Sequence, residues 1–130
     1  MTDTLSLLLV AQVGPADEHD VDGGWAVLEE AAAADLLDRA ARLWVDGAYR
    51  GDFEEDVQAI LGITVEVTIR SAEHRGFVVQ AKRWAVERAL GWLNRSRRLA
   101  KDFEERVASS VAWIYLAFCR LLLRRLAAAQ

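Results

Sequence analysis

The residues whose types and spacing could do chemistry surround one carboxylate, Glu87, in the stretch from Arg83 to Arg98. Apolar residues recur there at helical spacing and predict a buried stripe beside the acid: Val86, Ala89, Leu90 and Leu93. Gly91 leaves bare backbone one turn further on, and arginines surround the acid: Arg83, Arg88, Arg95, Arg97 and Arg98. Such an acid could face a metal ion and a phosphate. The alternative is a surface glutamate paired with arginine on an ordinary amphipathic helix.

A second acid, Asp46, stands at the end of a short apolar run. The run from Arg42 to Asp46 predicts a buried strand, and Gly47 follows it at once. In open α/β sheets, binding sites gather at the carboxyl ends of strands. Asp46 is therefore the second candidate site residue.

The other elements must position these two acids. The spacing predicts a buried strand over Leu5 to Val13 and a half-buried strand over Thr64 to Arg70. It also predicts three further helices: Trp25 to Ala41, Asp52 to Leu61 and Arg106 to Ala128. Asp52 is the expected N-cap of its helix, and Gly62 is the expected stop. The segment 71–76 predicts a charged loop, and 77–79 leads into the Glu87 helix. Alternating strands and helices predict an α/β fold in one domain, residues 1–130.

Composition narrows the class of protein. The 130 residues are 53% hydrophobic and 28% charged, which argues against disorder. The single cysteine, Cys119, cannot form an internal disulfide, which fits a reducing cytoplasm. Its side chain is expected in the core. The longest apolar segment, Val107 to Cys119, falls short of the roughly 20 residues that span a bilayer, so the chain is expected to be soluble.

Charge divides the chain into two unlike halves. Residues 1–60 carry 14 acids and 3 bases, a net charge of −11, whereas residues 61–130 carry 6 acids and 13 bases, a net charge of +7. The basic half indicates an anionic partner. The alternative is that the two halves neutralise each other within one fold.

Several segments resemble the DDE transposases of bacterial insertion sequences. Trp44-Val45-Asp46-Gly47-Ala48-Tyr49 is similar to the strand end that carries the family's second catalytic aspartate. Other segments resemble the region of the catalytic glutamate and the last helix of the family: Gly76 to Val79, Arg83 to Arg88, Arg97 to Glu104, and Trp113 to Leu126. The resemblance runs nearly from end to end.

The resemblance implies a ribonuclease-H-like fold, here incomplete, with a mixed sheet flanked by helices and a long C-terminal helix. In that family three carboxylates bind two divalent metals, Mg²⁺ or Mn²⁺, for phosphodiester cleavage and strand transfer. Asp46 would be the second acid and Glu87 the third, both as catalytic residues and metal ligands. Basic residues would bind DNA: Arg83, Arg88, Arg95, Arg97, Arg98 and Lys101. Asn94 stands where the family often has a lysine or arginine, so Arg95 or Arg98 would have to substitute.

The start of the chain departs from the family pattern. Met1 to Leu8 resembles the turn between the second and third strands of the fold, so Asp3 is not expected to be the first catalytic acid. The chain is then expected to be the C-terminal portion of a transposase catalytic domain, whose own metal binding and activity are open. One reading is a domain that supports DNA transposition in the intact parent. The other is an inactive remnant that binds DNA, associates with itself or pairs with a full-length transposase. Its place would be the cytoplasm, at the nucleoid.

Other polar and aromatic residues have plainer interpretations. His19 and His74 have no partner at metal-ligand spacing and are expected to be solvated. The five tryptophans are expected to pack in the core, although Trp84 and Trp92 flank Glu87 and either could stack on a displaced base.

Overall fold

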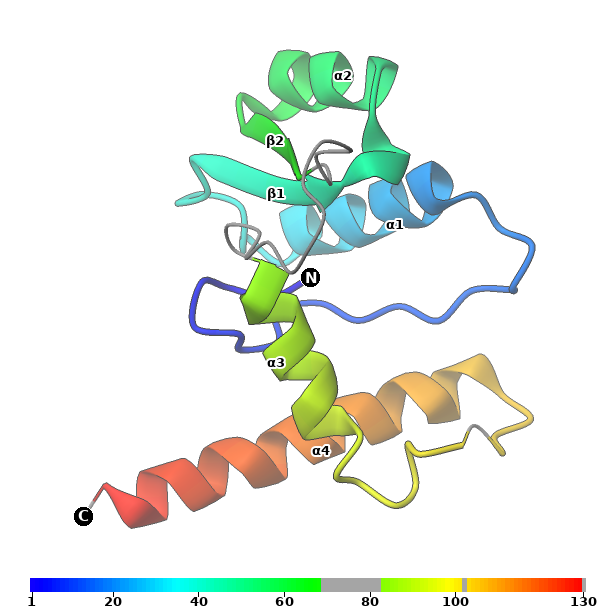
Figure 1. Ribbon diagram of the computed structural model, residues 1–130, viewed down its shortest axis with the longest axis vertical. Coiled ribbons are helices and arrows are strands. Elements are labelled where there is room, and N and C mark those ends of the chain that lie inside the picture. The colour runs from blue at the N-terminus through cyan, green and yellow to red at the C-terminus, as the bar shows by residue number, and fades with distance from the viewer. Residues whose placement is uncertain (69–82, 102, 130) are drawn as a thin grey trace, which may run out of the picture. The chain divides into compact units, whose positions relative to one another are not determined.

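The computed structural model describes residues 1–68, 83–101 and 103–129 of the chain. The chain divides into two compact units: Met1–Ala16 with Ala85–Gln130, and Asp17–Trp84. The unit Asp17–Trp84 contains both described strands together with helices, whereas the named elements of the other unit are helices (Figure 1). The predicted loop at 71–76, the segment 77–79 and His74 lie outside the described residues.

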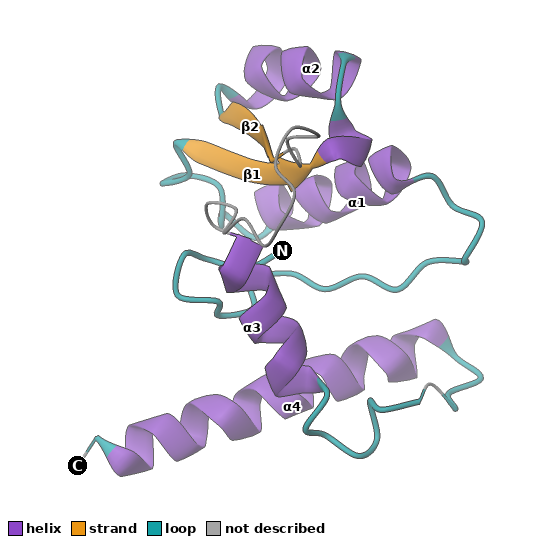
Figure 2. Cartoon of the chain, in the orientation of Figure 1, coloured by secondary structure: helices purple, strands orange, loops and turns teal. Residues whose placement is uncertain are grey.

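The unit Asp17–Trp84 is built on two parallel strands, β1 (Arg42–Asp46) and β2 (Thr64–Thr68) (Figure 2). Their register pairs Arg42 with Thr64 and Asp46 with Thr68. Across the pair, the indole Nε1 of Trp44 donates to Glu66 Oε2 at 2.6 Å, and Arg42 forms an ion pair with Glu66 at 2.6 Å. The described sheet is thus parallel, where the sequence predicted a mixed sheet. The α/β class is confirmed.

The connection between the strands contains the 3₁₀ helix η1 (Gly47–Tyr49) and helix α2 (Asp52–Leu61). Parallel strands need such a crossover, so the arrangement is a βαβ unit. The predicted bounds of α2 are confirmed, and its stop is Gly62, which adopts a left-handed conformation with φ 68°. The N-cap is Gly51 and not Asp52, which is the first helical residue.

Helix α1 (Asp20–Ala33) begins before the predicted Trp25 and ends before the predicted Ala41. Its end is a Schellman motif, because Leu36 N donates to Ala31 O at 2.9 Å and Asp35 N donates to Ala32 O at 3.0 Å. Asp35 holds the left-handed position with φ 56°, which is normally given to glycine. The alanine-rich sequence therefore continues past the point where the helix stops.

Helices α1 and α2 pack against each other around the ring of Phe53. The core of this unit contains Leu28 and Ala31 of α1, Phe53 and Val57 of α2, and Ile63, which precedes β2. The rings of Trp25 and Tyr49 pack on Phe53, with centroids 5.3 Å and 5.1 Å from its own. Ile60, on the same helix as Phe53 and Val57, is exposed.

The N-terminal segment of the other unit is a tight turn and an extended stretch. The predicted strand Leu5 to Val13 is wrong, since within residues 1–16 the only β-bridge is an isolated antiparallel one between Thr2 and Leu8. Asp3 Oδ1 accepts hydrogen bonds from Leu5 N and Leu7 N, both at 2.8 Å. Two N–H groups that a sheet ladder would use are thereby taken by a side chain.

Helix α3 (Arg83–Leu93) presents a different face to its unit than the apolar spacing predicted. Ala85 and Ala89 are buried, whereas Val86 and Leu90 are 51% and 54% exposed. The large side chain on the buried face is Trp92, whose ring meets that of Phe118 edge to face at 6.4 Å. Packing of the indole, flanked by small alanines, therefore sets the orientation of the helix.

Helix α4 (Val107–Ala128) is the long C-terminal helix that the sequence predicted. Phe118 and Ser110 are its buried residues, while Leu116, Leu123 and Leu126 are exposed. Cys119, expected in the core, is exposed as well. By length and composition α4 is the one described helix that could cross a membrane. One such helix does not by itself indicate a membrane protein, because core helices of soluble proteins can have the same length and composition.

Candidate functional site

Asp46 is the last residue of β1 and is exposed. Its Oδ1 accepts a hydrogen bond from Ala48 N at 2.9 Å, so the carboxylate caps η1. A carboxylate has about four acceptor positions, so this bond leaves capacity for a further ligand. Asp46 lies at the carboxyl end of a strand, as predicted. The strand itself was predicted to be buried, but its residues are partly or fully exposed.

Tyr49, at the end of η1, interacts electrostatically with two acids, Asp20 and Asp46. Its ring packs on Phe53 and against the first turns of α1 at Gly24. Burial raises the pKa of the Tyr49 hydroxyl, and the charges of Asp20 and Asp46 raise it further. Two carboxylates thus act on one phenol. Sequence reasoning missed Asp20 and Tyr49, because Asp20 precedes the predicted helix and only the fold joins it to η1.

Glu87 lies on α3, in the other compact unit, and is exposed. A Cβ added at Gly91 would meet no atom within 4 Å, so the backbone one turn beyond Glu87 is open. Among the described residues there is no group of three or more His, Cys, Asp and Glu side chains that could hold a metal ion. The roles of Asp46 and Glu87 as metal ligands stay predictions.

The arginines expected to bind DNA divide into two groups by their contacts. Arg88 Nε donates to Ser6 Oγ at 3.0 Å, and its Nη2 donates to the Leu5 carbonyl at 2.7 Å. Arg98 forms an ion pair with Glu104 at 2.7 Å and lies 5.3 Å over the ring of Trp113. These two side chains therefore hold their own unit together.

The second group has no such engagement. Arg95, Arg97 and Lys101 are exposed in the connection between α3 and α4, and within the described residues none of them makes an ion pair or side-chain hydrogen bond. Arg83, the remaining member of the predicted set, is the first residue of α3. Of the two residues expected to replace the basic side chain missing at Asn94, Arg95 is the freer.

An open pocket of about 250 Å³ lies in the unit that contains α3 and α4. Its walls are mostly apolar, from Leu90, Leu93 and Trp113, and the Arg98 and Glu104 pair stands among the lining residues. Asn94 lines it too. Because Arg98 is paired with Glu104 in an apolar wall, we expect its side chain to stabilise this unit and not to bind phosphate.

Comparison with known families identifies a match over most of the chain. The family described as Transposase DDE domain matches residues 1–122. No similar curated protein and no similar solved structure was found.

Proposed function

The chain belongs to the DDE transposase-domain family, and from this premise we propose that it acts on DNA, with Asp46 and Glu87 as the second and third catalytic acids. The observation that carries the proposal is the place of Asp46, which is fixed by its bond to Ala48 at the carboxyl end of β1. We also assign the chain to the ribonuclease-H-like fold and residues 1–130 to one catalytic domain. The βαβ unit and the long helix α4 support that assignment.

The two acids suit a hard cation. Both carboxylates are exposed, and carboxylate oxygens are the ligands that Mg²⁺ and Mn²⁺ prefer. A bound divalent cation would activate water or a DNA 3′-hydroxyl and stabilise the leaving oxygen. The chain's own contribution is to hold Asp46 through a backbone N–H and to present Glu87 on a helix.

DNA would be held by the exposed cations of the connection after α3: Arg95, Arg97 and Lys101. Each phosphate that such a residue neutralises contributes about 0.9 to the slope of log affinity against log salt concentration. Because Arg98 already forms an ion pair with Glu104, its replacement should alter stability more than the salt slope. Insertion-sequence ends would be the substrate, and the cytoplasm, at the nucleoid, would be the place of action.

A second candidate function is DNA binding without cleavage, alone or together with another transposase chain. The observation that favours it is Asp3, whose Oδ1 is engaged by two backbone N–H groups of a tight turn. Asp3 accepts two backbone hydrogen bonds where Asp46 accepts one, so its carboxylate is the less available of the two for a metal ion.

One pair of measurements separates these functions. Binding of a fluorescent duplex is measured by anisotropy, and nicking of supercoiled plasmid is measured with Mg²⁺ and with Mn²⁺. Nicking by the wild-type chain that is lost in Asp46→Asn and Glu87→Gln, but kept in Glu105→Gln, supports the catalytic proposal. Glu105 is a matched control, since it is an exposed glutamate of the same unit as Glu87. Binding without nicking supports the second candidate. Absence of binding contradicts both.

A further inference from the structure

Two arginines from different helices lie over one indole ring in the unit Met1–Ala16 with Ala85–Gln130. The guanidinium carbon of Arg125, in the last turn of α4, is 4.1 Å from the centroid of Trp92. The guanidinium carbon of Arg88, on α3, is 5.1 Å from the same centroid. The two cations therefore lie within about 9 Å of each other, whichever faces of the ring they occupy.

All three side chains are held before any ligand arrives. Arg88 is fixed by Ser6 and the Leu5 carbonyl, and Trp92 is fixed by the buried ring of Phe118, which is only 4% exposed. Arg125 rests on the indole through a cation–π contact. Side chains that are already ordered lose little conformational entropy on binding, in contrast to free arginines and lysines on a surface.

The site also has the charge and the access that an anion requires. Arg88 and Arg125 are both exposed, so a ligand can reach them. Two positive charges that share one aromatic ring repel each other, and an anion near both would offset that repulsion. The planar fork of guanidinium groups matches the oxygens of a phosphate.

We propose that Arg88, Trp92 and Arg125 form a phosphate-binding site, the indole–arginine site, which takes one or two neighbouring backbone phosphates of bound DNA. The inference rests on the proposed DNA binding and adds a contact on α4, separate from the exposed cations after α3. Sequence reasoning missed Arg125 because the apolar spacing of α4 marks only its packing face. The position of Arg125 also has a structural explanation, because a cation in the last turn of a helix offsets the helix dipole.

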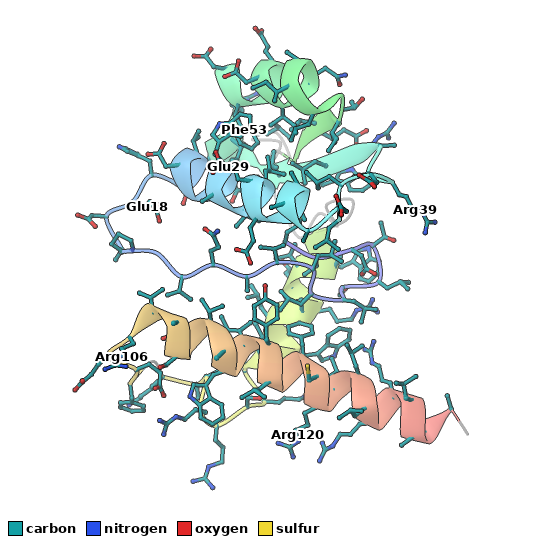
Figure 3. All side chains as sticks on the ribbon, turned by 180° about the vertical axis from the view of Figure 1, so that it is seen from behind. Glu18, Glu29, Arg39, Phe53, Arg106 and Arg120 are labelled. Carbon is teal, nitrogen blue, oxygen red and sulfur yellow. The ribbon has the colours of Figure 1, made fainter. Side chains whose placement is uncertain are left out.

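The test compares Arg125→Gln with Arg120→Gln. Arg120 projects from the same helix (Figure 3) and is exposed. It makes no cation–π contact within the described residues. Its replacement therefore removes the same charge without removing a contact to an aromatic ring. Duplex affinity is measured by anisotropy between about 0.05 and 0.3 M salt, the range in which phosphate contacts dominate. Thermal unfolding confirms that both variants are folded.

Loss of one phosphate contact should lower the salt slope by about 0.9 in Arg125→Gln, and reduce affinity about eightfold at about 0.1 M salt. Arg120→Gln should keep the wild-type slope. Equal slopes in the two variants, with wild-type DNA binding intact, would overturn the inference and leave the proposed function standing.

Vesicles of phosphatidylserine provide the other arm. If Arg125→Gln weakens binding to these vesicles and not to DNA, the cations serve a membrane surface and the inference is wrong. A wild-type chain that binds no DNA refutes the proposed function itself.

Discussion

The ring of Tyr49 lies directly against the backbone of Gly24, so that a Cβ on this glycine would be 2.5 Å from the Tyr49 Cε1 atom. Real Cβ atoms essentially never approach another atom so closely. The absence of a side chain at Gly24 thus allows η1 to pack on α1. Since Asp46 is the N-cap residue of η1, this contact supports the local structure of the candidate site.

Replacement of Gly24 by alanine should therefore destabilise the chain by about 1–3 kcal/mol, the usual cost of overpacking. Its neighbour Gly23 is a matched control, because a Cβ there would meet only Glu18 Oε2, at 3.8 Å. Gly23→Ala should stabilise α1 by up to about 1 kcal/mol, since alanine is the better helix former. Urea denaturation of both variants measures the difference. Equal effects of the same sign would show that Tyr49 does not restrict this position.

The cap at Asp46 can be separated from its charge. In Asp46→Asn the amide oxygen could still accept a hydrogen bond from Ala48 N, whereas Asp46→Ala removes the acceptor. We expect Asp46→Asn to unfold within about 0.5 kcal/mol of wild type and Asp46→Ala to lose about 1 kcal/mol. Denaturant midpoints measure the stability. If both variants retain full stability, the Ala48 contact contributes nothing to η1.

The turn at Asp3 gives a similar contrast. Asp3→Ala removes the acceptor of two backbone hydrogen bonds and should cost about 1–3 kcal/mol. Asp3→Asn keeps an oxygen in the same place and should cost far less. A metal ligand would behave differently, because either variant would lose it. Mn²⁺ affinity, followed by isothermal titration, should therefore be unchanged in Asp3→Asn.

The raised pKa of Tyr49 predicts a loss of stability at alkaline pH. The pKa of the folded state lies above the ordinary value of 10.0, so the protonated phenol favours the folded chain. This contribution is fully present below pH 10.0 and is lost as the pH rises through the higher folded value. Tyr49→Phe should show a smaller fall in Tm above this pH than wild type. Parallel Tm curves for the two chains would rule out this linkage.

The elements of the middle of the chain could be predicted because local signals mark their ends. Gly62 supplies the left-handed stop of α2, and the change from an apolar run to Asp46 and Gly47 ends β1. The end of α1 could not be predicted in this way. Its left-handed residue is Asp35, and the alanines on both sides of the stop are equally good helix formers.

The predicted strand over Leu5 to Val13 failed for a tertiary reason. Ser6 adopts a φ of 65° and is fully buried, and its hydroxyl is held by Arg88 from a helix far along the sequence. An apolar run alone cannot reveal that partner. The candidate acids were found by their context, whereas the engagement of Arg88 and Arg98 depends on contacts that spacing does not encode.

The two compact units differ in how they can form during translation. The segment Asp17–Trp84 is continuous, so its strands and helices can pair as soon as it leaves the ribosome. The other unit joins the first sixteen residues to α3 and α4, and Ala11 N bonds to the Tyr115 hydroxyl at 3.2 Å. At a synthesis rate of about 5–20 residues per second, the apolar N-terminal segment waits roughly 5–20 seconds for α4. During that interval a chaperone that binds exposed leucines would compete with native folding, and slower translation would lengthen its opportunity.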